Sequence, residues 1–133
     1  LTETEFRDLL ELHLVLLLAA IATAPNAAAA PVSADQPYPD RIADLFLAIA
    51  ERTSNGEIVA SIAAIGDRLQ FSRHFDAAIL GDVESEYRRI ETAVADAEPQ
   101  AAVRNMLLGY HERRAHEAAR FARMLGAHQG GQA

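Results

Sequence analysis

The sequence predicts an all-α protein, on the strength of three observations. First, apolar residues recur at helical spacing in one segment after another. Second, these segments are separated by capping residues, glycine and proline. Third, no stretch alternates between apolar and polar residues for long enough to form a strand. We therefore expect an antiparallel bundle of about five to seven helices. A chain of 133 residues is long enough for one domain with one core and too short for two.

The first predicted helix follows Thr2, because a hydroxyl with Glu5 three residues later fits a capping box. Apolar residues then keep helical spacing from Phe6 to Ile21, and Pro25 follows the end. The second half of this helix is apolar nearly all round, which predicts a buried position. Residues 25–39 hold four of the five prolines and are predicted to be mainly loop, with one turn of helix at 27–30.

Capping signals separate the remaining predicted helices. Asn55 before Gly56 supplies a break and a new N-cap, Asp82 caps a later helix, and Glu98 before Pro99 suits the first turn of the last one. The predicted helices are 40–52, about 57–75, one from Asp82 through Val94, and one from Pro99 to Leu125, followed by a flexible tail over 126–133.

Composition excludes several classes of protein. The chain has 12 arginines and no lysine against 19 acidic residues, and its net charge of −7 argues against a surface that grips nucleic-acid backbone. The absence of cysteine excludes disulfides, thiolate metal sites and cysteine nucleophiles.

The longest apolar stretch, Leu12 to Ala22, is shorter than the ~20 residues that span a bilayer and follows acidic residues rather than a basic leader. We expect a cytoplasmic protein.

Three patches along the chain resemble one known family when they are taken in order. They are Phe6-Arg7 with Glu11 and Ala19-Ala20; Leu45 to Ala50 leading into Thr53-Ser54-Asn55; and Glu86-Tyr87-Arg88-Arg89-Ile90 followed by Ala93, Ala101-Ala102 and Met106. Their order and spacing resemble the all-helical C-terminal effector domain, called FCD, of the GntR-type bacterial transcription regulators.

This resemblance implies a role in sensing and dimerisation rather than catalysis. It implies that residues 1–125 form an FCD-like effector-binding domain with a truncated second helix, and that two copies form a homodimer. DNA would be bound only through a winged helix-turn-helix domain preceding Leu1. No phosphate loop, nucleophile elbow or paired-carboxylate spacing is visible, so we expect no enzymatic activity.

The family commonly holds a divalent metal with one Asp and three His. Carried onto this sequence, those positions fall on Ile42, Phe46, Tyr87 and Gly109, none of which is a good metal ligand. We therefore expect no metal and no other cofactor. The same positions would instead line a largely apolar pocket for a small organic effector, such as an acyl or other largely apolar molecule.

Polar anchors for such an effector are predicted on two helices. Arg113 lies four residues after Gly109 and could pair with an anionic head group, Asn105 lies four residues before it, and Arg7 matches an arginine of the family's first helix. The alternative for each arginine is a surface ion pair with a nearby acid, contributing ~0–1 kcal/mol. His13, within an apolar helix, is expected to be a core or interface histidine.

Two alternatives stay open. The chain could be a helical scaffold whose interior is filled by its own side chains. It could also bind a metal in a shifted register, through Asp40 and Asp44 on one helix face with His74 and His111 from other helices. The His111-Glu112 pair does not make a zinc-protease motif with His116, because that motif needs its two histidines four residues apart.

Overall fold

The computed structural model describes residues 1–23, 35–95 and 100–130, and it is helical through these ranges, with no strand in them. This confirms the predicted all-α bundle. The elements are α1 (Glu3–Thr23), α2 (Tyr38–Ala50), α3 (Gly56–Leu69), the 3₁₀ helix η1 (Gln70–Phe75), α4 (Asp76–Leu80), α5 (Val83–Ala95), α6 (Gln100–His116) and α7 (Ala118–Gly130).

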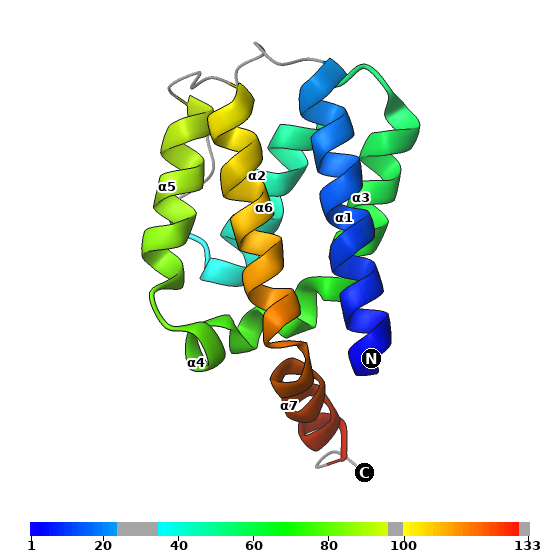
Figure 1. The fold of residues 1–133 in the computed structure, drawn as a ribbon, viewed down its shortest axis with the longest axis vertical. Helices are drawn as coiled ribbons and strands as arrows, with labels where there is room; N and C mark the ends of the chain where they lie inside the picture. Colours follow the sequence, from blue (N-terminus) through cyan, green and yellow to red (C-terminus); the bar gives the residue numbers. More distant parts are fainter. Residues whose placement is uncertain (24–34, 96–99, 131–133) are drawn as a thin grey trace.

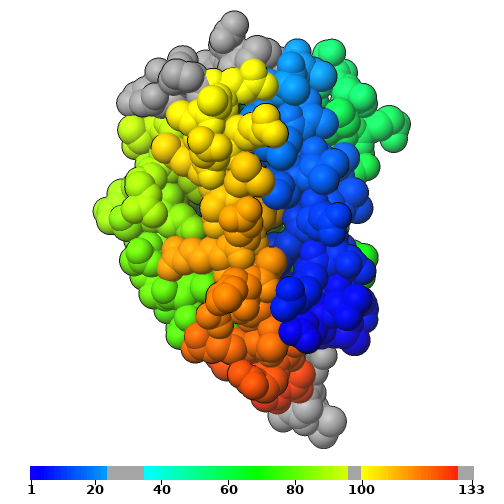
Figure 2. Space-filling view, viewed as in Figure 1, coloured from blue at the N-terminus to red at the C-terminus, as the bar shows by residue number. Residues whose placement is uncertain are grey.

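Helix α1 packs against α2, α3, α6 and α7, which makes it the central element of the bundle (Figure 1). Helices α1 and α5 run toward the same end of the molecule, and α6 returns antiparallel between them (Figure 1). On the face shown in Figure 2, α6 and α7, coloured yellow to red, lie between the green α5 and the blue α1. No helix in the described ranges is long and apolar enough to cross a membrane.

The predicted helix starts are largely confirmed. Thr2 Oγ1 accepts a hydrogen bond from the backbone N–H of Glu5 at 3.1 Å, which is the capping contact expected from the sequence. Helix α2 begins at Tyr38, two residues earlier than predicted, with Pro39 in its first turn. The predicted turn of helix at 27–30 and the predicted Glu98-Pro99 cap lie outside the described residues.

Two predicted helices are broken in the structure. The helix expected over 57–75 leaves the α-helical conformation after Leu69 and continues as η1. The helix expected from Pro99 to Leu125 is interrupted at Glu117, whose N–H bonds to the carbonyl of Arg114 at 3.1 Å, three residues back, instead of four. The prediction that the last helix ends before Gly126 is wrong, because α7 continues to Gly130.

Helix α3 has the N-cap that its sequence predicts. Asn55 Oδ1 accepts hydrogen bonds from the backbone N–H groups of Glu57 at 3.1 Å and Ile58 at 3.3 Å. These are two of the N–H groups that a helix start leaves without an intrahelical partner.

We expect Asn55→Ala to lower the free energy of unfolding by about 1 kcal/mol, because it removes the oxygen that accepts from both N–H groups. Urea unfolding followed by circular dichroism measures the loss. Ser54→Ala, at the exposed neighbouring position, is the matched control and should change little. Equal stability of the two variants would show that the cap contributes nothing.

The interior consists of two apolar clusters with buried polar residues between them. One cluster includes Leu17, Phe46 and Leu107, and the other includes Phe6, Leu69 and Phe121. Along α1, His13 lies between residues of the two clusters, and along α6 and α7 the same is true of Arg114. We call the following buried residues the polar layer: His13, Arg73, Asp76, Glu86, His111 and Arg114.

Candidate functional site

A cavity of about 260 Å³ lies beside the polar layer, among α1, α2, α3 and η1. Its polar lining includes one buried histidine, one buried arginine and two aspartates, and its wall is otherwise mostly apolar. The lining residues are His13, Ala43, Asp44, Phe46, Leu47, Ile62, Ala63, Gly66, Asp67, Gln70 and Arg73.

The buried polar side chains of this site come from two elements. His13 lies four residues before Leu17 and continues the buried stripe of α1, and Arg73 lies on the buried side of the 3₁₀ helix η1. His13 is 1% exposed and Arg73 is 4% exposed. Polar groups at these positions lose water on folding and need partners inside the protein or in a ligand.

The two buried histidines, His13 and His111, form a hydrogen-bonded pair whose direction is fixed by the backbone. His111 Nδ1 lies 2.7 Å from the carbonyl oxygen of Leu107, which can only accept, so this nitrogen carries a proton. In a neutral ring, His111 Nε2 is then an acceptor, and His13 Nδ1, 2.8 Å away, donates to it. His13 Nε2 is therefore left with a lone pair, and no residue of the described chain donates to it.

Burial keeps both imidazoles neutral. It lowers the pKa of His111 to about 4, while the hydrogen bond to Leu107 opposes the shift and the charge of Arg114 adds to it. The pKa of His13 is also lowered well below its usual value, first by burial and then by His111 and Arg73. The directional pair of neutral rings is thus the form present at neutral pH.

Arg73 is a buried cation that has no carboxylate partner among the described residues. Its Nη1 donates to Gln70 Oε1 at 2.8 Å, and its guanidinium carbon lies 5.6 Å from the centre of the Phe46 ring. Neither contact supplies a negative charge, and the carboxylate of Asp76, which interacts with Arg73 at longer range, is paired directly with Arg114. A guanidinium can donate up to five hydrogen bonds, so Arg73 has unused donors beside the cavity.

Arg114, in the same polar layer, is paired with two carboxylates. Its Nη2 lies 3.0 Å from Asp76 Oδ2 and 2.8 Å from Glu86 Oε1, and its guanidinium lies 3.5 Å from the centre of the Tyr110 ring. Tyr38 donates its hydroxyl to Asp76 at 2.8 Å. Burial raises the pKa of Asp76, while Arg114 and the Tyr38 hydroxyl oppose the rise. Arg114 is therefore fully engaged, and its role is structural.

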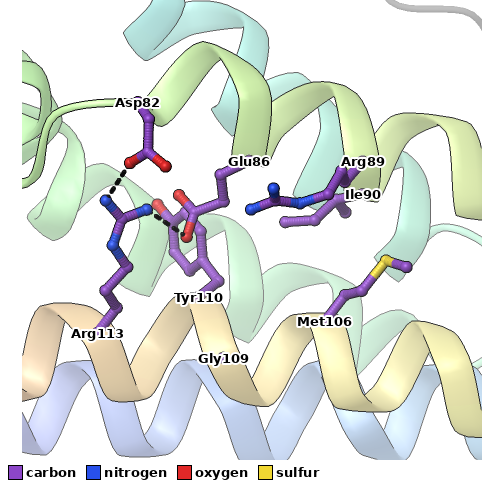
Figure 3. Close-up of a pocket in the computed structure, with 8 residues that line it drawn as sticks. All are labelled: Asp82, Glu86, Arg89, Ile90, Met106, Gly109, Tyr110 and Arg113. Atoms are coloured by element: carbon purple, nitrogen blue, oxygen red, sulfur yellow. Dashed lines mark hydrogen bonds and ion pairs between the residues drawn. The ribbon is translucent and has the colours of Figure 1, made fainter.

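A second, more open groove of about 450 Å³ lies between α5 and α6 (Figure 3). The side chain of Arg113 reaches across this groove, with Nη2 2.5 Å from Asp82 Oδ1 and Nη1 3.3 Å from Glu86 Oε2 (Figure 3). Gly109, which has no side chain, lines the groove on the α6 side (Figure 3). Because Arg113 already has two carboxylate partners, its charge is balanced within the protein. The other arginine of the groove, Arg89, is exposed to solvent, so the groove has no buried unpaired charge such as Arg73.

The predicted ligand residues on the first helices are distributed between the core and the surface. Ile42 and Phe46 are buried in the larger apolar cluster, and Phe46 also lines the cavity. Tyr87 is buried, with its hydroxyl donating to Glu91 at 2.8 Å. Arg7 is exposed and pairs with Glu3 at 3.4 Å, and it lines neither the cavity nor the groove.

The predicted residues on α6 lie on its outer side. Asn105 and Gly109 are exposed, and Gly109 and Arg113 line the groove rather than the cavity. The structure therefore does not bring the seven predicted ligand residues into one site, and Phe46 alone among them lines the cavity.

The alternative metal set is not assembled either. His74 is exposed, His111 is committed to His13 and Leu107, and Asp40 accepts from Gln70 Nε2 at 3.1 Å. Nowhere in the described ranges do three or more His, Cys, Asp or Glu side chains form a group that could hold a metal ion. Of the four residues, Asp44 alone lines the cavity.

Comparison with known proteins identifies no relative: no protein-family model, curated protein or solved structure matches the chain.

Proposed function

We propose that this chain is a ligand-sensing domain that binds a small organic anion in the cavity, with Arg73 as the anchor for the negative charge. The observation that carries the proposal is a buried guanidinium, 4% exposed, that lines a cavity and forms no ion pair within the described chain.

Burying a cation without a counter-charge is costly, because water is removed and no opposite charge replaces it. A carboxylate in the cavity would supply that charge and could accept two parallel N–H bonds from the guanidinium. The cavity volume of about 260 Å³ lies just below the ~300–1,000 Å³ of pockets for drug-sized molecules. A small carboxylate with an apolar portion beside Phe46 and Ile62 suits both the charge and the space.

Binding at this cavity would connect helices that the sequence places far apart. Arg73 lies on η1 and His13 on α1, so a ligand touching both would favour the helix arrangement that brings them together. A domain of this kind can transmit occupancy to a neighbouring domain only through such a difference in affinity.

The resemblance to FCD effector domains suggests the kind of protein in which this ligand-sensing domain would act. Its three patches fall on α1, on α2 and the start of α3, and on α5 and α6, within a helical bundle. We propose that the chain is the metal-free effector and dimerisation domain of a cytoplasmic GntR-type regulator. The homodimer would bind DNA through winged helix-turn-helix domains preceding Leu1 and would perform no catalysis.

Arg73→Gln is expected to weaken carboxylate binding by ~10- to 100-fold, because hydrogen bonds to a charged group contribute ~1.5–3 kcal/mol. The experiment titrates linear and branched aliphatic carboxylates of three to six carbons into the protein by calorimetry and thermal shift. Arg104→Gln, an exposed arginine of α6, is the matched control and should bind as the parent does. Circular dichroism verifies that both variants fold.

Two results would contradict the binding proposal. One is a flat response of the parent protein to every carboxylate, which would favour the scaffold alternative. The other is equal affinity in Arg73→Gln and the parent. The regulator role is tested separately by the coding sequence upstream of Leu1, where a winged helix-turn-helix is expected. A native protein beginning at Leu1 would remove the regulator role and leave the binding proposal standing.

A further inference from the structure

We propose that the cavity selects an amino carboxylate, that is, a carboxylate that also carries a protonated amine. This inference rests on the proposed function, since it takes Arg73 as the carboxylate anchor and asks what the remaining polar groups of the same cavity would recognise. Gln70 also lines the cavity, but its amide oxygen accepts from Arg73 and its amide nitrogen donates to Asp40. The other polar groups are His13, Asp44 and Asp67, and all three offer acceptors rather than donors.

His13 provides the buried acceptor. Because its Nδ1 proton is donated to His111, its Nε2 has only a lone pair to offer, and no described residue donates to that atom. A plain carboxylate has no hydrogen to place there and would bring its own lone pairs against this nitrogen. A ligand with an N–H donor would satisfy a polar atom that is otherwise buried without a partner.

Asp44 on α2 and Asp67 on α3 supply negative charge to the same cavity. Asp44 and Asp67 are both exposed, and neither side chain forms a hydrogen bond or an ion pair within the described residues. A simple anion entering the cavity would be repelled by both carboxylates. A ligand that also carries an ammonium group would be attracted by them.

The apolar wall of the cavity indicates the nature of the ligand's carbon skeleton. Phe46, Leu47 and Ile62 line the cavity together with two alanines, so an aliphatic skeleton can bury its surface there. Arg73 and His13 are buried, whereas Asp44 and Asp67 are exposed, so the guanidinium and the imidazole lie at the inner part of the cavity and the two carboxylates lie toward its opening. The ligand class is therefore an aliphatic amino carboxylate of small size.

The test compares each amino carboxylate with the same carbon skeleton lacking the amine. The probes are leucine against 4-methylpentanoate, and 5-aminopentanoate against pentanoate, titrated by calorimetry at pH 7.5. We expect at least one amino carboxylate to bind about tenfold more tightly than its partner, because its ammonium donates charge-assisted hydrogen bonds that the deaminated acid cannot form. The two pairs differ in the spacing between amine and carboxylate.

The double variant Asp44→Asn/Asp67→Asn keeps the shape of the cavity and removes its two negative charges. It is expected to lose the preference for the amine while still binding the deaminated acids through Arg73. Asp8→Asn, an exposed aspartate of α1 that does not line the cavity, is the matched control and should keep the preference.

The outcomes separate this inference from the proposed function. If the deaminated acids bind the parent protein as tightly as both amino carboxylates, or if the double variant keeps the full preference, the amine specificity is refuted and anion binding stands. If no carboxylate binds in an Arg73-dependent manner, the proposed function fails, and this inference fails with it.

Discussion

Replacing Arg114 by methionine is expected to lower the free energy of unfolding by about 3–5 kcal/mol, the cost of leaving a buried charge without its partner. Arg114 is 2% exposed and holds Asp76 and Glu86 at 3.0 and 2.8 Å. Glu86 would keep Arg113 at 3.3 Å, whereas Asp76, itself 1% exposed, would lose its ion-pair partner. Urea unfolding at pH 7, followed by circular dichroism, measures the difference.

A second substitution and a change of pH identify the cause of this loss. Adding Asp76→Asn to Arg114→Met should restore part of the stability, because the uncompensated charge is then gone. Without Arg114, burial raises the pKa of Asp76 further, so the deficit of the single variant should shrink as pH falls from 7 to 5. Arg113→Met should cost only about 1 kcal/mol, because Arg113 and Asp82 are 30% and 63% exposed and Glu86 keeps its ion pair with Arg114. Equal losses in the two arginine variants would contradict this account.

Acidification is expected to destabilise the protein through its histidine pair. The pKa of His111 is about 4 in the folded protein, against ~6.5 for an unfolded histidine. The unfolded state therefore binds the proton more readily, and the stabilisation is fully present above pH ~6.5 and is lost as pH falls toward 4. At ~1.4 kcal/mol for each pKa unit, the loss from His111 is about 3 kcal/mol, and His13 shifts in the same direction.

The measurement is the free energy of unfolding at several pH values between 7 and 4. His111→Gln cannot take up this proton, so its stability should decline less steeply across this interval than that of the parent. His116→Gln, at an exposed position of α6, is the control and should follow the parent curve. Identical curves for His111→Gln and the parent would show that the buried imidazole does not contribute to acid sensitivity.

Local signals in the sequence predicted most of the fold and missed the helix breaks. Thr2 and Asn55 bind the N–H groups that their positions predict, because a cap depends on only a few neighbouring residues. Neither proline nor glycine stands at the helix breaks at Leu69 and Glu117, so the sequence has no local signal for them. The segments that follow pack against distant elements, η1 against α2 and α7, and α7 against α1, which is tertiary information.

The site was less predictable because family positions guided the expectation. They led to Ile42, Tyr87 and Gly109, of which two belong to the apolar core and one lies at the surface. A more direct signal was present: in the sequence, Arg73 and Arg114 stand at helical spacing from apolar residues of their segments, where a charged residue is unusual. Periodicity alone could not show that Arg114 meets two carboxylates and Arg73 meets none, because those partners come from other elements.

The polar layer also fixes the register of the bundle. If α1 slid along α6 by one helical turn, about 5.4 Å, a leucine of α1 would replace His13 opposite His111. His111 Nε2 would then face a hydrocarbon surface, and His13 would enter an apolar cluster with both ring nitrogens unsatisfied. Leucine against leucine permits many alignments of two helices, whereas one directional hydrogen bond permits only one. A bundle built mainly from interchangeable aliphatic side chains thus acquires a single alignment.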